Sequence, residues 1–338
     1  MAEGGKKSKG QAEETRQRGP PAPDPLIILS PPRSFSSVVS TMIGEHPQLY
    51  GFPELHICAA NTVEELMNVE ARRGCPGPPG LIRLLAQELY GTQTQKTVTM
   101  AIAWFRQRKD WSTKKLFDYV LELVSPKIGV EKSPVTSSSF QNLERANAWF
   151  PKAYYLHLTR HPISARSSIH EHREQLKEKQ VQRATSGRFE VDSMLVWYDI
   201  HQRIVRFLDT LPPGQWMRVR GEDVLSYPEI YLPQISEWLG IRADTACVEA
   251  MMHPERSPYA CVGPRPVRGG NDSKFIRSPA LRRGVIREPS LEKFFDDPEW
   301  NWASKTFIAS MEESGFEVAP PEDMERQVSA LANAFGYH

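Results

Sequence analysis

Residues 25–54 of this 338-residue chain read PLIILSPPRSFSSVVSTMIGEHPQLYGFPE, and this stretch is the most informative part of the sequence. Its apolar run Leu26–Leu29 follows a polar leader and ends at two prolines, which cannot donate a ladder hydrogen bond. Such a run is typical of a buried parallel strand. Apolar residues then recur at helical spacing, after a cluster of serines suited to an N-cap. The stretch therefore predicts a strand, a tight turn, and a helix that begins with a serine cap.

The turn between this strand and this helix gathers groups that favour an anion. Arg33 stands among three serines at the expected start of the helix, where backbone N–H groups are free. These serines are Ser34, Ser36 and Ser37. A helix N-terminus with hydroxyls and an arginine binds phosphate or sulfate, although the stretch by itself leaves open an ordinary capped turn. A Walker A loop is excluded because its two glycines and its Lys-Ser/Thr pair are missing.

The composition is that of a soluble globular protein, with 40% hydrophobic and 25% charged residues. The formal net charge of +1 gives no overall attraction to nucleic acid or to an anionic membrane, so an anion site has to be built locally. The four cysteines are scattered without metal-ligand spacing, which predicts reduced thiols and no bound metal. No apolar run approaches a membrane span, and the polar leader lacks the apolar core of a signal peptide. We therefore expect a cytoplasmic protein whose partners include neither nucleic acid nor a membrane.

The rest of the chain alternates predicted strands with predicted helices. Residues 1–24 contain no large apolar side chain except Met1, so we expect a disordered tail, followed by one domain over 25–338. The expected strands lie near 26–29, 48–52, 127–132, 153–158 and 216–220. Three helical patterns within about 81–125 predict a helical insert that forms a wall or lid beside the site. Alternating strands and helices indicate a parallel sheet covered on both faces.

A second informative stretch, residues 156–168, reads LHLTRHPISARSS. A predicted strand ends at Arg160, and a predicted helix begins just after Pro162, at the first-turn position that suits proline. Ser168 follows eight residues after Arg160, on the first or second turn of that helix. An arginine at the strand tip and a nearby hydroxyl are able to bind one phosphate together. The alternative is an arginine that pairs with a surface carboxylate.

In combination, these two stretches resemble the nucleotide-binding segments of sulfotransferases, in particular the soluble, bacterial-type members. These enzymes use 3'-phosphoadenosine 5'-phosphosulfate (PAPS) as the sulfuryl donor and release 3'-phosphoadenosine 5'-phosphate (PAP). The resemblance implies that the Pro-Arg-Ser-x-Ser-Ser turn, including the backbone at Phe35, holds the 5'-phosphosulfate. It further implies that Arg160 and Ser168 bind the 3'-phosphate. A glycine is common in the family where Phe35 stands, so this turn departs from the family's usual form.

Further matches continue along the chain, and the resemblance covers roughly residues 25–285. Lys132 lies where the family places a lysine near the sulfuryl group. The run that begins at Arg220 resembles a family segment whose tyrosine packs on the adenine, and Gly221 replaces that tyrosine here. Residues 269–275 resemble a late glycine-rich, basic loop, which implies that Gly270 and Lys274 contact the cofactor. The implied fold is a single α/β domain with a central parallel sheet flanked by helices, the P-loop NTPase-like sulfotransferase fold, with a helical insert.

Sulfuryl transfer needs positively charged groups that stabilise the negative charge on the bridging oxygen, and a base for the acceptor hydroxyl. Arg33 and Lys132 are the residues expected to supply this positive charge. Glu54, which ends the second expected strand, is the predicted base, because a glutamate at the matching place serves tyrosylprotein and heparan sulfotransferases. His56 is the second candidate. Cytosolic steroid and phenol enzymes use a histidine where this chain has Pro134, so that option is closed.

The sequence thus predicts transfer of a sulfuryl group from PAPS to a hydroxyl of a small-molecule acceptor, free or carrier-bound. An ATP-dependent small-molecule kinase is the first alternative, and the missing Walker lysine disfavours it. A nucleotide-binding scaffold without catalysis is the second alternative. The acceptor's identity and the oligomeric state stay open, because no motif in the chain addresses either.

Overall fold

The computed structural model describes residues 21–180, 193–292 and 321–338, and in them five parallel strands form one sheet. The strand order is β2-β3-β1-β4-β5. The strands are β1 (Leu26–Leu29), β2 (Leu49–Gly51), β3 (Ile128–Glu131), β4 (Tyr154–Thr159) and β5 (Trp216–Arg220). Each lies within a residue or two of the stretch that the apolar pattern predicts. The central strand β1 pairs with β3 on one side and with β4 on the other, so the chain builds the two halves of the sheet in turn.

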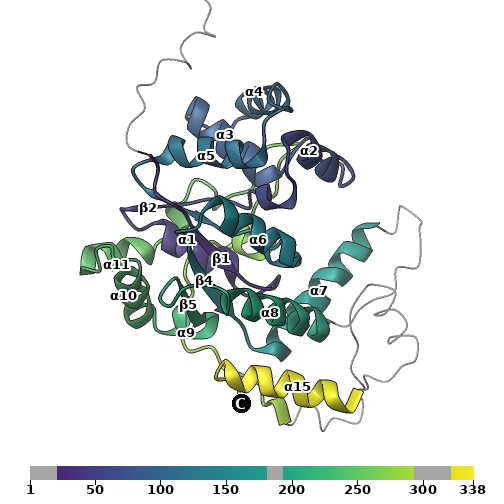
Figure 1. Ribbon diagram of the computed structural model, residues 1–338, viewed down its shortest axis with the longest axis vertical. Helices are drawn as coiled ribbons and strands as arrows, with labels where there is room; N and C mark the ends of the chain where they lie inside the picture. The colour runs from purple at the N-terminus through teal and green to yellow at the C-terminus, as the bar shows by residue number, and fades with distance from the viewer. Residues whose placement is uncertain (1–20, 181–192, 293–320) are drawn as a thin grey trace, which may run out of the picture.

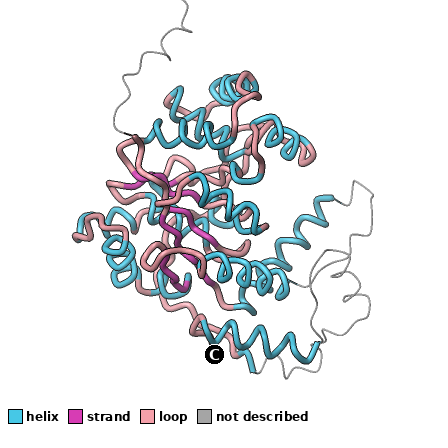
Figure 2. The backbone as a smooth tube through the Cα atoms, viewed as in Figure 1, coloured by secondary structure: helices cyan, strands magenta, loops and turns pink. Residues whose placement is uncertain are grey.

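Helices cover both faces of this sheet, as Figures 1 and 2 show, which confirms the predicted α/β fold. In chain order they are α1 (Ser36–Gly44), α2 (Val63–Ala71), α3 (Pro79–Tyr90), α4 (Gln95–Arg106), α5 (Thr113–Val124), α6 (Phe140–Trp149), α7 (Pro162–Gln180), α8 (Ser193–Leu208), α9 (Gly221–Ser226), α10 (Pro228–Trp238), α11 (Thr245–Met251), α12 (Ser273–Arg277) and α15 (Pro321–Ala334). The three helices expected within 81–125 are α3, α4 and α5. Helix α2 has no counterpart among the expected elements, because its nine residues are too few and too polar for a clear apolar period.

The core divides at the sheet, and strand β1 contributes to both sides of it. All four β1 residues are buried, and successive side chains point to opposite faces. Ile27 and Leu29 pack in the cluster that contains residues of α3, α4 and α5. Leu26 and Ile28 pack in the cluster formed with α1, α9, α10 and α11. Burial of each such side chain stabilises the fold by roughly 1.5–3 kcal/mol, so β1 ties the two layers together.

The C-terminal residues 321–338, to which the sequence analysis assigns no role, belong to a third core cluster. Helix α15, yellow in Figure 1, packs with α7 and α8. Beyond the helix, Tyr337 is fully buried, and its hydroxyl lies 2.9 Å from Thr159 Oγ1 at the end of β4. The same hydroxyl donates to Glu222 Oε2 at 3.0 Å. The end of the chain therefore supports the tip of the strand that carries Arg160.

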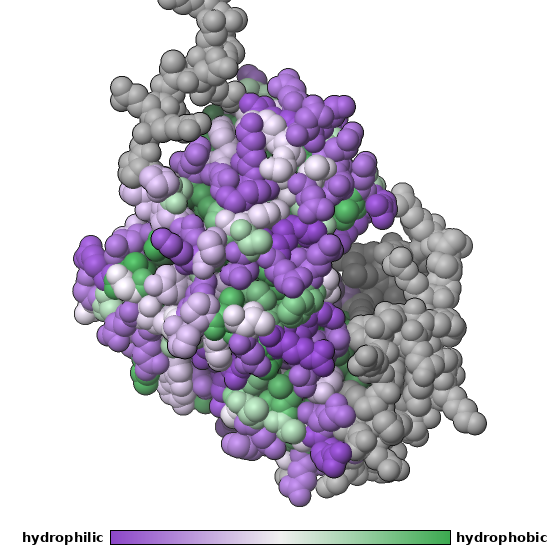
Figure 3. All heavy atoms as spheres, viewed as in Figure 1, coloured by the Kyte–Doolittle hydropathy of each residue, from purple (hydrophilic) through white to green (hydrophobic). Residues whose placement is uncertain are grey.

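Two further predictions concern the N-terminal tail and membrane spans. The expected disordered tail falls outside the described residues, apart from positions 21–24. None of the described helices combines the length and apolarity needed to cross a bilayer. On the face drawn in Figure 3, hydrophilic residues predominate, with apolar residues scattered between them.

Candidate active site

The carboxyl ends of β1 and its two neighbours open on a cavity of about 950 Å³. Parallel sheets bind ligands at this edge, where the loops that follow the strands converge. The lining brings together most of the residues that the sequence singles out. They are Arg33, Phe35, Ser36, Ser37, Glu54, Arg160, Ser168 and Lys274. Residues from position 33 to position 274 of the sequence thus line one cavity.

The turn after β1 is strained and lacks the expected serine cap. Phe35 is the N-cap residue of α1 and makes no side-chain cap hydrogen bond, so the prediction of a serine cap is wrong. The physical reason is the left-handed backbone at Phe35 (φ 60°), which makes Phe35 the N-cap and places Ser36 and Ser37 inside the first turn of the helix. Arg33 (φ 66°) and His56 (φ 56°) share this conformation, and these three are all the non-glycine positive-φ residues that the structure describes. Such strain, about 1–3 kcal/mol each, concentrates at functional sites.

Phe35 fills the space that a side chain at position 221 would need. A Cβ on Gly221 would lie 2.8 Å from Phe35 Cδ2 and 3.2 Å from the carbonyl oxygen of Thr159. On its other side, the Phe35 ring faces the Arg160 guanidinium, whose carbon lies 4.1 Å from the ring centroid. The bulky residue at position 35 and the small one at position 221 are therefore complementary in size.

Arg160 and Ser168 both form hydrogen bonds with Arg33, in the turn after β1. Arg160 Nη1 donates to the Arg33 carbonyl oxygen at 2.6 Å, and Arg33 Nε donates to Ser168 Oγ at 3.2 Å. Arg160 Nε is buried and has no hydrogen-bond partner in the described structure. Burial lowers the pKa of Arg160 to about 10, helped by the neighbouring Arg33 charge and opposed by Glu222. The two predicted phosphate-binding stretches thus lie in direct contact and present two arginines. One N–H donor, Arg160 Nε, has no hydrogen-bond partner among the described residues.

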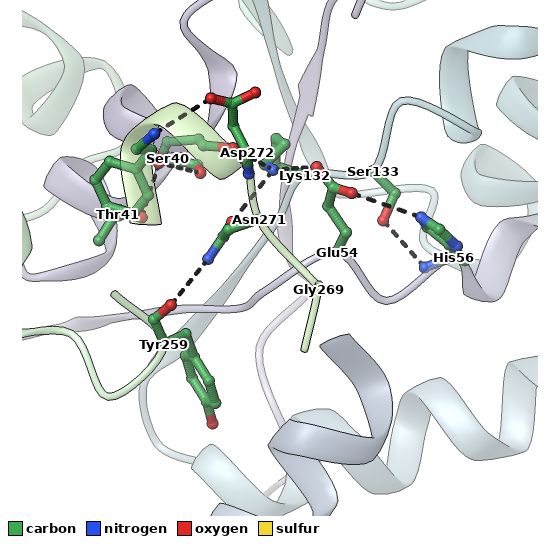
Figure 4. Close-up of polar contacts among 12 residues, drawn as sticks. Ser40, Thr41, Glu54, His56, Lys132, Ser133, Tyr259, Gly269, Asn271 and Asp272 are labelled. Carbon is green, nitrogen blue, oxygen red and sulfur yellow. Dashed lines mark hydrogen bonds and ion pairs between the residues drawn. The ribbon is translucent and has the colours of Figure 1, made fainter. Parts of the chain in front are cut away.

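Lys132 and Glu54 form an ion pair beside the cavity, which Glu54 lines and behind which Lys132 is buried (Figure 4). Lys132 Nζ lies 2.7 Å from Glu54 Oε1 and donates to Ser37 Oγ at 3.0 Å and Asn271 Oδ1 at 3.3 Å. Burial raises the pKa of Glu54, but Lys132 and His56 outweigh burial and lower that pKa to about 2. Glu54 is therefore ionised at neutral pH, as an acceptor of protons has to be.

His56 lies between two carboxylates. Its Nδ1 is 3.0 Å from Glu70 Oε1 and its Nε2 is 3.7 Å from Glu54 Oε2, while its backbone N–H donates to Ser133 Oγ at 3.1 Å. Burial lowers the pKa of His56, but the two glutamates outweigh burial and raise that pKa to about 9. An imidazole that is already protonated at neutral pH has no capacity to accept a proton, which favours Glu54 over His56 as the base.

The late loop, residues 269–275, contacts Glu54 and the turn after β1. The Gly270 carbonyl accepts from Glu54 N at 2.7 Å, and Asp272 N donates to Ser37 Oγ at 3.0 Å. The Asp272 carboxylate pairs with Arg33. Lys274, in contrast, is half exposed at the rim and pairs with Glu171. The loop therefore contributes backbone and polar groups to the interior and its lysine to the mouth.

A family model described as the sulfotransferase family matches residues 25–245, which is more than half of the chain. The chain belongs to the sulfotransferase family. No match was found among curated protein sequences.

Solved structures with this sulfotransferase's fold include two domains from biosynthetic systems. The sulfotransferase domain from the curacin biosynthetic pathway is 21% identical with a TM-score of 0.65, over 94% of this chain and 98% of that one. The sulfotransferase domain from the Synechococcus PCC 7002 olefin synthase is 22% identical with a TM-score of 0.61, over 88% of this chain and 97% of that one. At these identities the likeness shows the fold.

Three polar residues of the sulfotransferase's site have no signal in the sequence. Glu70 lies on α2, which the apolar pattern does not reveal, and it is 1% exposed. Asn271 and Asp272 stand inside the late loop, where the sequence draws attention to glycines and basic residues instead. A buried carboxylate or amide looks like any polar loop residue until its neighbours are known. Among the described residues, no group of three or more His, Cys, Asp or Glu side chains is arranged to hold a metal ion.

Proposed function

We propose that this chain transfers a sulfuryl group from PAPS to a hydroxyl of a small-molecule acceptor, with Glu54 as the general base. PAPS, when bound, supplies the sulfuryl group and leaves as PAP. The proposal is supported by the family match and by the single observation that carries it, the buried and unpartnered Arg160 Nε beside Arg33 and Ser168. A buried cationic donor without a partner costs stability unless an anion binds to it.

The described residues fit such a donor at two points. Arg160 and Ser168 lie where a 3'-phosphate is able to accept hydrogen bonds, and the first turn of α1 offers backbone N–H groups free of any side-chain cap. The cavity of about 950 Å³ is large enough for a nucleotide together with an acceptor. Ser34 Oγ, also buried and without a hydrogen-bond partner in the described structure, is a further polar group of that turn.

Lys132 links donor binding to the base. Its ammonium group lies between Ser37, in the first turn of α1, and Glu54. An anion at the start of α1 competes with Glu54 for this ammonium group, and its approach weakens the ion pair. Burial then raises the pKa of Glu54 toward the range of an effective base. In this way Glu54 takes the acceptor's proton while Lys132 and Arg33 stabilise the charge that develops on the bridging oxygen.

The acceptor we propose is a hydroxylated small molecule, either free or attached to a carrier. Both structures reported above are described as sulfotransferase domains, one from a biosynthetic pathway and one from a synthase. A domain of such a system fits an acceptor that another part of the system delivers. We therefore propose that both the free and the carrier-attached forms be offered in an acceptor screen.

Calorimetric titration of the purified protein with PAP, with ADP and AMP as controls, tests the donor site. We expect micromolar binding that requires the 3'-phosphate. Preference for ADP would instead support the kinase alternative. Binding of PAP without transfer from PAPS to any acceptor in a broad screen would support the non-catalytic scaffold.

A further inference from the structure

Arg83, on α3, is a fully buried cation without a carboxylate partner in the part of the chain that the structure describes. Its guanidinium instead donates to three neutral acceptors. These are Gln93 Oε1 at 2.7 Å, the Gly269 carbonyl oxygen at 3.0 Å and Cys261 Sγ at 3.4 Å. An arginine stays charged in proteins, and burying that charge without an anion is costly. Two of its three bonds go to the loop segment 259–272, which leads into the late loop (residues 269–275) and contains its first half.

This loop reaches from Arg83 directly into the site. Two residues after the carbonyl that Arg83 holds, Asn271 Oδ1 accepts from Lys132 Nζ, and Asn271 Nδ2 donates to the Tyr259 carbonyl oxygen at 3.4 Å (Figure 4). The next residue, Asp272, contacts Arg33 and Ser37. The loop thus has one end on the helical insert and the other on the reacting groups.

Backbone packing restricts the same loop to one position. Gly270 has a φ of +102°, and a Cβ on it would lie 2.7 Å from Gly80 Cα, in the first turn of α3. A Cβ on Gly80 would in turn lie 2.2 Å from the carbonyl oxygen of Glu54. Three chain segments therefore meet backbone to backbone, one helical turn from Arg83. A small shift of the loop moves both Glu54 and Asn271.

We propose that Arg83 is a positioning residue that fastens the late loop to the helical insert and so aims Asn271, Asp272 and Glu54 at the reacting groups. Its effect on turnover rests on the proposed function, whereas its hold on the loop does not. Arg83 itself lies behind the loop and does not line the cavity. The insert accordingly acts as the fixed wall against which the loop is held.

Hydrogen exchange of the loop amides, read by mass spectrometry without nucleotide, tests this hold. The first variant is Arg83→Met, which removes the guanidinium donors. The second is Arg83→Lys, which retains the positive charge and an ammonium group long enough to donate to the Gly269 carbonyl oxygen. Arg203→Met is the matched control, since Arg203 on α8 donates to the Ser137 carbonyl oxygen at 3.1 Å and pairs with Asp199, away from the loop. We expect exchange of residues 263–272 to rise about tenfold in Arg83→Met, less in Arg83→Lys, and not in the control, with the sheet amides unchanged.

Titration with PAP of the same three variants supplies the second readout. We expect PAP affinity to fall about tenfold in Arg83→Met and to recover in part in Arg83→Lys, because the loop contacts Arg33 and Ser37. Loop exchange and PAP affinity that change no more in Arg83→Met than in Arg203→Met would overturn the proposal. If the wild-type protein does not bind PAP, that result counts against the proposed function alone, and the exchange measurement decides the role of Arg83.

Discussion

Strands β4 and β3 are each followed by a cation beside the cavity, Arg160 and Lys132, and the surroundings compensate the two charges differently. Arg160, after β4, forms no ion pair among the described residues and keeps an unbonded Nε. Lys132, after β3, is 1% exposed and bonded to three oxygens, one of them the Glu54 carboxylate. The Arg160 end is incomplete, with one unbonded donor, whereas the Lys132 end is already neutralised. In the function proposed above, the first binds an anion and the second exchanges partners during the reaction.

Changing Glu54 to Gln tests the neutralised end and carries the largest expected effect. The amide has no carboxylate to accept a proton, so kcat is expected to fall roughly a hundred- to ten-thousand-fold. PAP affinity is not expected to fall, because Glu54 holds no phosphate in this proposal and its loss removes a competitor for the Lys132 ammonium group. Steady-state kinetics and calorimetry measure the two quantities.

The exposed Glu64→Gln on α2 is the control, expected to behave as the wild type. Unchanged turnover in Glu54→Gln would move the base to His56 or to the acceptor, and would remove the functional meaning of the Lys132 ion pair.

Changing Arg160 to Ala tests the incomplete end. Loss of charge-assisted hydrogen bonds, about 1.5–3 kcal/mol, predicts a ten- to hundredfold loss of PAP affinity. ADP affinity should change much less, because ADP lacks the 3'-phosphate. Ser168→Ala should weaken PAP binding in the same direction by a smaller factor, since it removes one neutral hydroxyl. Equal losses for PAP and ADP, or no loss at all, would contradict the assignment of Arg160 and Ser168 to the 3'-phosphate.

The size match of Phe35 and Gly221 sharpens the description of the Arg160 end. Gly221→Ala places a methyl group 2.8 Å from the Phe35 ring, and overpacking of this kind costs about 1–3 kcal/mol of unfolding free energy. In a Phe35→Ala background most of that cost should vanish, because the ring is gone. Denaturant unfolding of the wild type, both single variants and the double variant measures this coupling. Additive effects would mean that the two positions do not compete for one space.

The pH dependence of stability tests the neutralised end by a different route. The pKa of His56 is raised to about 9, so its contribution is fully present below the unfolded value of about 6.5 and is lost as pH rises toward 9. We expect the wild type to lose about 1–3 kcal/mol more than His56→Gln between pH 6.5 and 9 in denaturant unfolding.

His253 offers the matched control, because it also lies between two glutamates but on the surface. Solvent screens that pair of contacts, so His253→Gln should follow the wild type closely. A His56→Gln curve parallel to that of the wild type would show that the two glutamates do not hold His56 in its charged form.

The parts of the site that could be predicted are those tied to local pattern. Buried strands are recognisable in the sequence as apolar runs. Arg33 and Arg160 each follow such a run closely, so the sequence predicts that both lie at the same edge of the sheet. The serine cap is the instructive failure. Serines at the start of α1 are suited to capping, yet the left-handed backbone at Phe35 starts the helix without one. Local propensity there yields to the left-handed turn, which leaves the start of α1 without a side-chain cap.

Local sequence patterns suffice to predict the parallel sheet, the resemblance to sulfotransferases and the cationic strand tips, because each of these depends on residues close together in the chain. Three contacts become visible only in the folded chain: Glu70 bonds His56, Phe35 fills the space beside Gly221, and Arg83 bonds the Gly269 carbonyl oxygen. These contacts join segments 14 to 186 residues apart. Their energy comes from burial and from mutual geometry, which no local pattern encodes.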